Sequence, residues 1–377
     1  MRISRRTLLG AMGATAAAVT TGSLHALGQS SSPRDNIDSE SRTIRLDKNE
    51  NPYGPADNVA AALRSGLEVA NRFPESELHA LTRRIAEVHA VRPEQVILGC
   101  GSTEILYMCS RAFLGPQKRL LMSAPGFDPM GDYARSAGAY VQTLPLTKNY
   151  AHDLPLFAQQ TASAGLVYIS NPHNPTGTLT PRKDIEAFVR TLPAHTYVII
   201  DEAYHHYVTP SSTYASFIDQ PMNDPRVIVT RTFSKIYGLA GMRIGYGIAS
   251  PQTAQRIVAY RLREGVNVSA ARASRIALEA NDHVKTCVQR NTSNRQEFFN
   301  QSNARMLRWI DSQTNFVLLN TGRNAIEVAD HFRKNNVLVA FGFPLMENYV
   351  RVTVGTPEEM KEFWRVWDAM PQHAMAM

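Results

Sequence analysis

One lysine differs from the other cations of this sequence in its surroundings. Lys235 lies in "RTFSKIYGLAGMRIGY" (residues 231–246), where most neighbours are apolar and the next cation, Arg243, follows eight residues later. This pattern predicts a buried amine. Burial penalises the charged ammonium and shifts a lysine toward its neutral, nucleophilic form. The segment therefore indicates a lysine kept for covalent chemistry.

Three polar side chains near the ends of apolar runs are candidate partners for this lysine. Asp201 ends the run in "YVIIDEAYHHYV", where a lone carboxylate is unfavourable unless it meets a cation such as a protonated ring nitrogen. Tyr204 follows closely, so its hydroxyl could reach the same ring. Asn174, in the proline-rich loop "SNPHNPTGT", could donate a hydrogen bond, although an Asn-Pro turn by itself also explains this loop.

A second group of residues suits a phosphate and a flat ring. In "VILGCGSTEILYM", Ser102 and Thr103 open an expected helix after a glycine turn, which is typical of a phosphate cradle but also of a plain helix start. Arg243 suits a phosphate, with an ordinary surface arginine as the alternative. Phe127 follows a strand in "SAPGFDPM" and could stack on a planar ring, with core packing as the alternative.

Together these residues match the needs of one small molecule. Pyridoxal 5′-phosphate is an aldehyde on a pyridine ring that carries a phosphate. It needs a nucleophilic lysine, a carboxylate for the ring nitrogen and a phosphate site. The order and spacing of the residues therefore predict pyridoxal 5′-phosphate as the cofactor.

The elements that must position these residues alternate between strands and helices. Apolar runs typical of strands lie near residues 95–99, 119–123, 139–146, 165–170, 197–201, 226–233 and 243–249. Helical spacing occupies residues 58–69, 76–89 and 251–281. This alternation predicts an α/β fold with a mostly parallel mixed sheet flanked by helices. Ligands of such sheets bind outside the carboxyl ends of the strands, which is where the candidate residues lie.

The pattern changes near residue 270. Strands are expected near residues 315–320, 337–341 and 349–355, with helices over residues 325–334 and at the end of the chain. We therefore predict an N-terminal linker and arm over residues 29–57, a large cofactor-binding domain over 58–269, and a smaller α+β domain over 270–377.

The first 28 residues have the layout of a secretory signal. Arg5 and Arg6 precede a weakly apolar run over residues 8–19 and a plausible cleavage region at 26–28, which is typical of twin-arginine export. The run is short compared with the ~20 apolar residues of a spanning helix. We therefore predict a cleaved signal, no stable membrane span after its removal, and a periplasmic or secreted enzyme, or a cytoplasmic one if the leader is not functional.

Charge and cysteine content indicate neither nucleic acid nor metal. The formal net charge is +7, but the basic residues are scattered, so no nucleic-acid partner is expected. Cys100, Cys109 and Cys287 form no C-x-x-C pair, and the histidines have no metal-ligand spacing. We predict free thiols and no metal site.

Six motifs resemble those of a known family, and the resemblance covers roughly residues 44–363. They are "LDKNENPYGP", "GCGSTEI", "SNPHNPTG", "IIDEAY", "TFSKIYGLAGMRIGY" and "YVRVTVGTPEEM". In this order they resemble the fold-type I, class I/II pyridoxal-phosphate-dependent aminotransferases, and are most similar to histidinol-phosphate aminotransferases. The resemblance implies a phosphate site made of Ser102, Thr103, Ser234 and Arg243. It also implies a ring site made of Phe127, Asn174, Asp201, Tyr204 and Lys235.

The same resemblance implies a substrate site and a dimer. Arg351, in "YVRVTVG", matches the arginine that binds the substrate's carboxylate, or the phosphate of histidinol phosphate. Asn51 would lie near the substrate. Family members are homodimers, and Tyr53 would reach the phosphate site of the neighbouring subunit.

One departure from the family bears on the substrate. Histidinol-phosphate enzymes usually carry a second arginine in the segment that here reads "VLVAFGFPLMENYV", which has no cation before Arg351. An apolar wall suits a hydrophobic or amphipathic side chain better than a dianion. The leading hypothesis is therefore an aminotransferase that acts on an α-amino acid and a 2-oxo acid, with Lys235 as base and acid. The alternatives are a decarboxylase, lyase or oxidase on the same scaffold, and a cofactor-binding regulator without catalysis.

Overall fold

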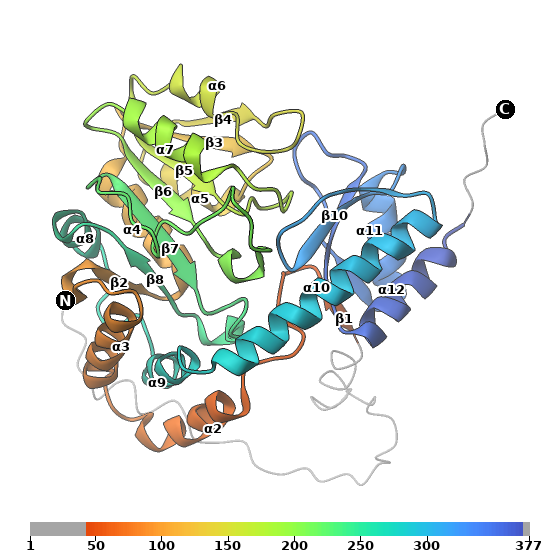
Figure 1. The fold of residues 1–377 in the computed structure, drawn as a ribbon, viewed down its shortest axis with the longest axis horizontal. Coiled ribbons are helices and arrows are strands. Elements are labelled where there is room, and N and C mark those ends of the chain that lie inside the picture. The colour runs from red at the N-terminus through yellow and green to blue at the C-terminus, as the bar shows by residue number, and fades with distance from the viewer. Residues whose placement is uncertain (1–42, 372–377) are drawn as a thin grey trace, which may run out of the picture. The chain divides into compact units, whose positions relative to one another are not determined.

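The computed structural model describes residues 43–371, and its largest sheet has seven strands in the order β2-β8-β7-β6-β5-β3-β4 (Figure 1). These strands are β2 (Val96–Gly99), β3 (Arg119–Ala124), β4 (Val141–Pro145), β5 (Ala164–Ser170), β6 (Tyr197–Asp201), β7 (Val227–Thr232) and β8 (Gly245–Ile248). The pairs from β4 to β7 are parallel, and β8 runs antiparallel to both β2 and β7. The mostly parallel, mixed sheet predicted from the sequence is confirmed.

The register of this sheet places polar strand ends side by side. Asp201 pairs with Ser170 of β5 on one side and with Thr230 of β7 on the other. The strands are parallel here, so their carboxyl ends meet at one edge of the sheet. The polar residues that follow these strands in the sequence therefore lie at that edge.

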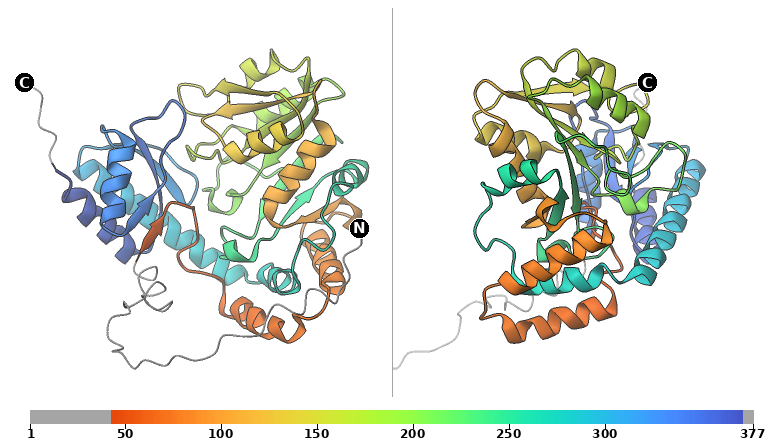
Figure 2. Two further views of the ribbon diagram at one scale, coloured as in Figure 1. Left: turned by 180° about the vertical axis from the view of Figure 1, so that it is seen from behind. Right: turned by 60° about the vertical axis from the view of Figure 1, so that its left-hand side comes forward.

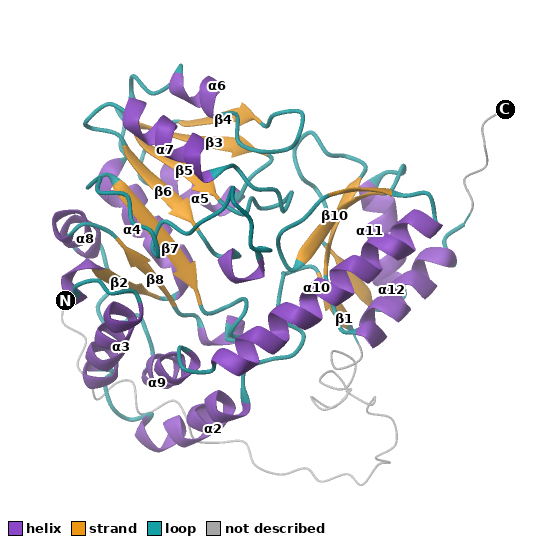
Figure 3. Ribbon diagram, viewed as in Figure 1, coloured by secondary structure: helices purple, strands orange, loops and turns teal. Residues whose placement is uncertain are grey.

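Helices cover both faces of the sheet (Figures 2 and 3). Successive side chains of a strand point to opposite faces, and β5 shows this alternation: Leu166 and Tyr168 belong to one apolar core, Val167 and Ile169 to the other. The first core is completed by α4 (Gly101–Phe113), α5 (Asp128–Ser136) and α8 (Pro251–Val258). The second is completed by α2 (Asp57–Gly66), α3 (Glu75–Val88), α6 (Leu154–Ala158), α7 (Arg182–Thr191) and α9 (Val268–Ala277).

Two smaller sheets are formed by strands of the C-terminal part of the described chain together with β1 near its start. One is antiparallel and contains β9 (Arg308–Ile310), β10 (Phe316–Asn320) and β12 (Tyr349–Thr353); the other pairs β1 (Ile44–Leu46) in parallel with β11 (Val337–Val339). Their helices are α10 (Asn281–Ala304), α11 (Ala325–Lys334) and α12 (Pro357–Asp368). Aromatic side chains of these helices pack together, with the rings of Phe332 and Phe363 stacked 4.7 Å apart. The domain boundary near residue 270 stays a prediction.

Two helical segments differ from the sequence-based expectation. The helix expected over residues 251–281 is two helices, because α8 ends at Val258 and Glu264 adopts a left-handed backbone with φ 60°. Asn267 then caps α9 by accepting a hydrogen bond from the Ala270 N–H. The 24-residue helix α10 was not predicted. Within residues 43–371, no helix is long and apolar enough to cross a membrane.

Candidate active site

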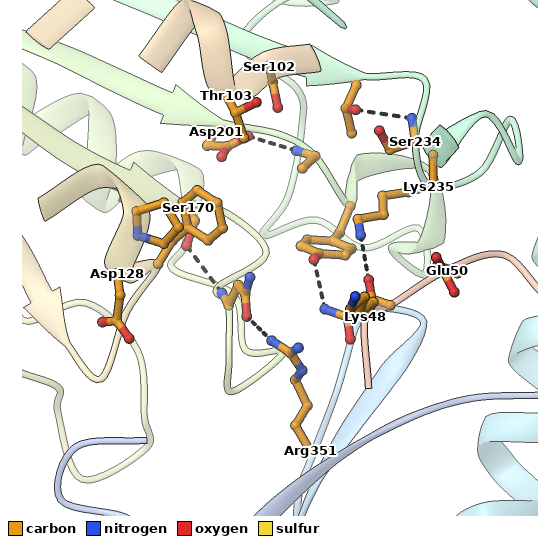
Figure 4. Close-up of a pocket in the computed structure, with 18 of the residues that line it drawn as sticks. Lys48, Glu50, Ser102, Thr103, Asp128, Ser170, Asp201, Ser234, Lys235 and Arg351 are labelled. Carbon is orange, nitrogen blue, oxygen red and sulfur yellow. Dashed lines mark hydrogen bonds between the residues drawn. The ribbon is translucent and has the colours of Figure 1, made fainter. Parts of the chain in front are cut away.

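A cavity of about 650 Å³ opens at the carboxyl ends of β5, β6 and β7 (Figure 4). Ten of the residues predicted from the sequence line it together: Ser102, Thr103, Phe127, Asn174, Asp201, Tyr204, Ser234, Lys235, Arg243 and Arg351. They come from loops and strand ends that are far apart in the sequence. The fold therefore brings the predicted constellation to one place.

Two predicted residues lie outside this cavity in the same chain. Asn51 donates a hydrogen bond from Nδ2 to the carbonyl of Ile236 at 2.9 Å. The Tyr53 hydroxyl accepts a hydrogen bond from Asn294 Nδ2 at 2.9 Å, and the guanidinium of Arg290 lies 4.8 Å from the Tyr53 ring centroid. Their predicted contacts with substrate and with a second subunit stay predictions.

Lys235 is half-buried at the cavity, and its pKa is shifted in the direction that its apolar neighbours predicted. Its Nζ donates a hydrogen bond to the carbonyl oxygen of Lys48 at 3.0 Å and lies 5.6 Å from the ring centroid of Tyr204. Burial, and next the positive charge of Arg351, lower the pKa of Lys235 to about 7. A substantial share of this lysine is therefore neutral and nucleophilic at neutral pH.

Asp201 is a buried carboxylate without a cation bonded to it. Tyr168 Oη donates to its Oδ2 at 2.8 Å, Thr230 Oγ1 donates to its Oδ1 at 3.0 Å, and the Ala203 N–H donates to Oδ1 at 3.2 Å. Among residues 43–371, no lysine, arginine or histidine forms an ion pair with it. Burial raises the pKa of Asp201. The carboxylate is thus held in place by neutral donors, with its charge left for a cationic ligand group.

The start of α4 and Arg243 form an anion site. Arg243 Nη1 donates to Ser234 Oγ at 3.3 Å, and its Nη2 donates to Thr103 Oγ1 at 3.4 Å. Gly101 has φ 74°, and a Cβ atom there would lie 2.5 Å from Arg243 Nη2, so glycine is required for this approach. Ser102 is buried beside these groups. Two hydroxyls, a helix N-terminus and a guanidinium without a carboxylate partner in the described chain fit a phosphate.

Arg351 forms a second anion site, on β12. Its guanidinium lies near two aromatic rings, 5.3 Å from the centroid of Phe316 and 5.5 Å from that of Phe343. Nη1 donates to Asn174 Oδ1 at 2.7 Å and Nη2 donates to the carbonyl of Asp47 at 2.9 Å. Nε is buried and has no hydrogen-bond partner among residues 43–371. Burial lowers the pKa of Arg351. An unpartnered, buried donor on a cation fits an anionic ligand group.

The remaining predicted residues face the space between these two anion sites. Tyr204 is buried and packs edge-on against Phe316 at 5.0 Å between centroids. The backbone N–H of Asn174 donates to Ser170 Oγ at 3.2 Å, which fixes the loop that carries this residue. Phe127 ends the connection from β3 and precedes α5 at the cavity wall.

Sequence reasoning missed the residues that hold the predicted ones in place. Tyr168 and Thr230 bond Asp201, and Asn49 Nδ2 donates to the hydroxyl of Tyr204 at 2.9 Å. Thr230 could have been found, because it is a polar residue that interrupts the apolar run of β7, where it pairs with Asp201. Asn49 carries no such indication, since its contacts depend on a distant strand.

The residues present fit pyridoxal 5′-phosphate. A lysine with a pKa near 7, a buried carboxylate awaiting a cation and a phosphate-binding helix start lie around one cavity. When bound, the cofactor supplies an aldehyde that bonds amines and a ring that accepts electrons from the substrate carbon. Among residues 43–371, no group of three His, Cys, Asp or Glu side chains is arranged to hold a metal ion.

Comparisons with known proteins agree with this geometry. The family described as "Aminotransferase class I and II" matches residues 41–366. A histidinol-phosphate aminotransferase from Symbiobacterium thermophilum is 33% identical over 326 residues, which cover 85% of this chain and 88% of that protein.

Solved structures show the same fold. The histidinol-phosphate aminotransferase from Sinorhizobium meliloti in complex with pyridoxal-5′-phosphate superposes with a TM-score of 0.81 at 27% identity, covering 90% of this chain and 93% of that one. L-threonine-O-3-phosphate decarboxylase from Porphyromonas gingivalis shares the fold with a TM-score of 0.76 at 23% identity, covering 86% and 98%. The chain therefore belongs to the class I and II aminotransferase family and is a pyridoxal 5′-phosphate-dependent aminotransferase.

Proposed function

We propose that this enzyme moves the amino group of an α-amino acid with an apolar or amphipathic side chain to a 2-oxo acid. The observation that carries this proposal is Arg351, whose guanidinium lies at the same cavity as Lys235 and has a buried, unpartnered Nε. A carboxylate is the ligand that satisfies such a planar cation. The amine of the same substrate would then face Lys235.

The surroundings of Arg351 favour one negative charge over two. The aromatic rings of Phe316 and Phe343 lie near the guanidinium, with centroids at 5.3 Å and 5.5 Å. The other cations at the cavity are Lys235, Arg243, the exposed Lys48, and Arg45, which is bonded to Glu50 at 3.3 Å. The relatives named above are histidinol-phosphate aminotransferases, so histidinol phosphate is the competing substrate.

The proposed work of each residue follows from its chemistry. Lys235 would remove the proton from the substrate's α-carbon and deliver it to the carbon that carried the cofactor's aldehyde, since an amine with a pKa near 7 exists in both forms at neutral pH. Asp201 would accept a hydrogen bond from the protonated ring nitrogen and so keep that nitrogen protonated. Tyr204 and Asn174, which line the cavity, would donate to the ring's oxygen, and Arg351 would orient the carboxylate.

A panel of amino donors tests the proposal. Purified enzyme loaded with pyridoxal 5′-phosphate is mixed with single amino acids or with histidinol phosphate, and the visible absorption of the bound cofactor is followed. We expect amino acids with large apolar or amphipathic side chains to bleach this band fastest, and the 2-oxo acid to be found as product. Faster bleaching by histidinol phosphate than by every amino acid would overturn the substrate assignment.

The same panel separates transamination from other reactions on this scaffold. Without a 2-oxo acid acceptor, a transaminase stops after one half-reaction per active site. Repeated turnover without an acceptor, with release of carbon dioxide or consumption of oxygen, would instead favour the decarboxylase, lyase or oxidase.

We also propose that the enzyme is a homodimer in which Tyr53 serves the partner subunit. In support, Tyr53 lies outside the cavity of its own chain. Mixing an inactive Lys235→Ala protein with an inactive Tyr53→Ala protein should restore activity, because one mixed site then holds both residues. No recovery in a mixture that exchanges subunits would contradict this arrangement.

We further propose export by the twin-arginine route. Arg5 and Arg6 lie outside the described residues, so this proposal rests on the sequence pattern alone. Cell fractionation should find the enzyme in the periplasm or medium, and replacing both arginines with lysine should retain it in the cytoplasm. If the unchanged enzyme and the variant with both arginines replaced were found in the same cell fractions, this route would be excluded.

A further inference from the structure

We propose that Asn49 is a positioning residue that turns the hydroxyl of Tyr204 into a hydrogen-bond donor toward the bound cofactor. The inference rests on the proposed placement of the cofactor ring beside Tyr204. It adds to the site a cavity-lining residue that was not predicted from the sequence.

Asn49 is held rigidly from several sides. It is 2% exposed and adopts a left-handed backbone with φ 54°, a conformation that asparagine and glycine tolerate better than other residues. Its backbone N–H donates to Thr353 Oγ1 at 2.9 Å, and its carbonyl accepts from Asn315 Nδ2 at 3.1 Å. Because the backbone is fixed on both sides, the direction of the side chain toward Tyr204 is fixed as well.

The hydrogen-bonding capacity of a phenol makes this contact directional. Asn49 Nδ2 can only donate, so Tyr204 Oη accepts at 2.9 Å and keeps its single proton for another acceptor. No other hydrogen bond of this hydroxyl is formed within residues 43–371, and Tyr204 lines the cavity. The phenol proton is therefore left to a ligand oxygen in the cavity.

The charges around Tyr204 keep its proton in place. Burial raises the pKa of Tyr204, and the charge of Arg351 and the bond from Asn49 offset part of this rise. The charge of Asp201, like burial, raises the pKa of Tyr204. The Nζ atom of Lys235 lies 5.6 Å from the centroid of the Tyr204 ring. A protonated phenol whose oxygen already accepts a hydrogen bond is a donor at neutral pH.

Neighbours of Asn49 bond two further residues of the site. The carbonyl of Asp47 accepts from Arg351 and that of Lys48 accepts from Lys235, as Figure 4 shows for the lysine. Three consecutive residues thus contact the predicted substrate arginine, the reactive lysine and the ring-binding tyrosine. This arrangement indicates that the segment sets the site before the ligands bind.

Two substitutions separate positioning from mere structural support. Asn49→Asp keeps the shape but replaces the donor with an acceptor, so the proton of Tyr204 turns toward the new carboxylate. Asn49→Gly tolerates the left-handed backbone and only removes the contact. Each is made alone and in the Tyr204→Phe background, where no hydroxyl remains to be oriented.

The readout is the pH titration of the visible absorption of the bound cofactor. A donor to the ring oxygen stabilises its anionic form and lowers the apparent pKa of this titration. Tyr204→Phe should therefore raise that pKa. Asn49→Asp should raise it by about one pH unit more when Tyr204 is present than in the Tyr204→Phe background. Asn49→Gly should cause a smaller rise that disappears in that background.

The outcomes distinguish this inference from the proposed function. Equal shifts in both tyrosine backgrounds would show that Asn49 acts without orienting Tyr204 and would overturn the inference. No shift on Tyr204→Phe alone would instead refute the placement of the cofactor, and absence of cofactor binding would refute the function. If Asn49→Asp fails to fold, the Asn49→Gly pair decides alone.

Discussion

Replacing Arg351 with glutamine removes the charge of the proposed carboxylate site and keeps a planar amide. In the structure the guanidinium donates to Asn174 and to the carbonyl of Asp47, and its Nε is buried without a partner. Losing one member of a buried charge pair costs about 3–5 kcal/mol. At about 1.36 kcal/mol per tenfold change in rate, we expect kcat/KM to fall by about 10²–10⁴ for an amino acid substrate.

The assay compares each amino acid with the amine that lacks its carboxylate. For the amine, Arg351→Gln should change kcat/KM little, because no carboxylate is there to lose its partner. The band of the bound cofactor should persist, since the phosphate site lies on α4 and at Arg243. Arg365→Gln, at an exposed arginine of α12, serves as the matched control. An equal loss with acid and amine would refute the carboxylate role.

The same substitution should also change the reactive lysine. The positive charge of Arg351 is one cause of the lowered pKa of Lys235. Without that charge the pKa of the lysine rises, so less of the amine is neutral at pH 7. The rate at which the cofactor-free protein captures pyridoxal 5′-phosphate should then reach its plateau at a higher pH than in the unchanged protein.

In the unchanged protein, that capture rate should increase about tenfold per pH unit below about pH 7 and level off above it, because only the neutral amine of Lys235 attacks the aldehyde. Stopped-flow absorbance measures the rate. A rate that does not change between pH 5 and 8 would contradict the lowered pKa. Gly101→Ala should weaken cofactor affinity at least about tenfold, since a Cβ atom crowds Arg243 and the backbone φ of 74° suits glycine. Fluorescence titration measures the affinity. An unchanged affinity would show that the phosphate binds elsewhere. Glu202→Ala should lower the free energy of unfolding by about 3–5 kcal/mol, because the buried Arg231, which is bonded to Glu202 at 3.0 Å, loses that carboxylate. Chemical denaturation measures this free energy. A loss under about 1 kcal/mol would mean that Asp219 alone satisfies the arginine.

Periodicity predicted the elements whose burial is apolar. The strand that ends at Asp201 and the helix over residues 325–334 bury mainly apolar side chains, so their spacing is visible in the sequence. Helix α10 is different, because Asn291, Arg295 and Ser302 are among the side chains that it buries. Asn291 and Arg295 both donate to the carbonyl of Thr314, so they satisfy their polarity through a loop far along the chain. No apolar period marks such a helix.

The site shows the same division. Residues at strand ends or in motif-bearing loops, such as Asp201 and Lys235, could be assigned because their chemistry conflicts with their apolar neighbours. Asn49 could not, because an asparagine before a turn has many ordinary explanations. Its role becomes visible only where β12 brings Thr353 against its backbone. Residues that support the site therefore cannot be predicted from the sequence when their partners are brought to them only by tertiary contacts.

The pairing of β1 with β11 has a consequence for how the enzyme is made. Asn49 and Thr353 are bonded although they lie 304 positions apart in the sequence, and Ile44 pairs with Val337. Contacts of such long range form only after the intervening chain is available. During synthesis on the ribosome, the pocket would therefore stay incomplete until nearly the whole polypeptide has emerged, and capture of pyridoxal 5′-phosphate would be one of the last events in maturation.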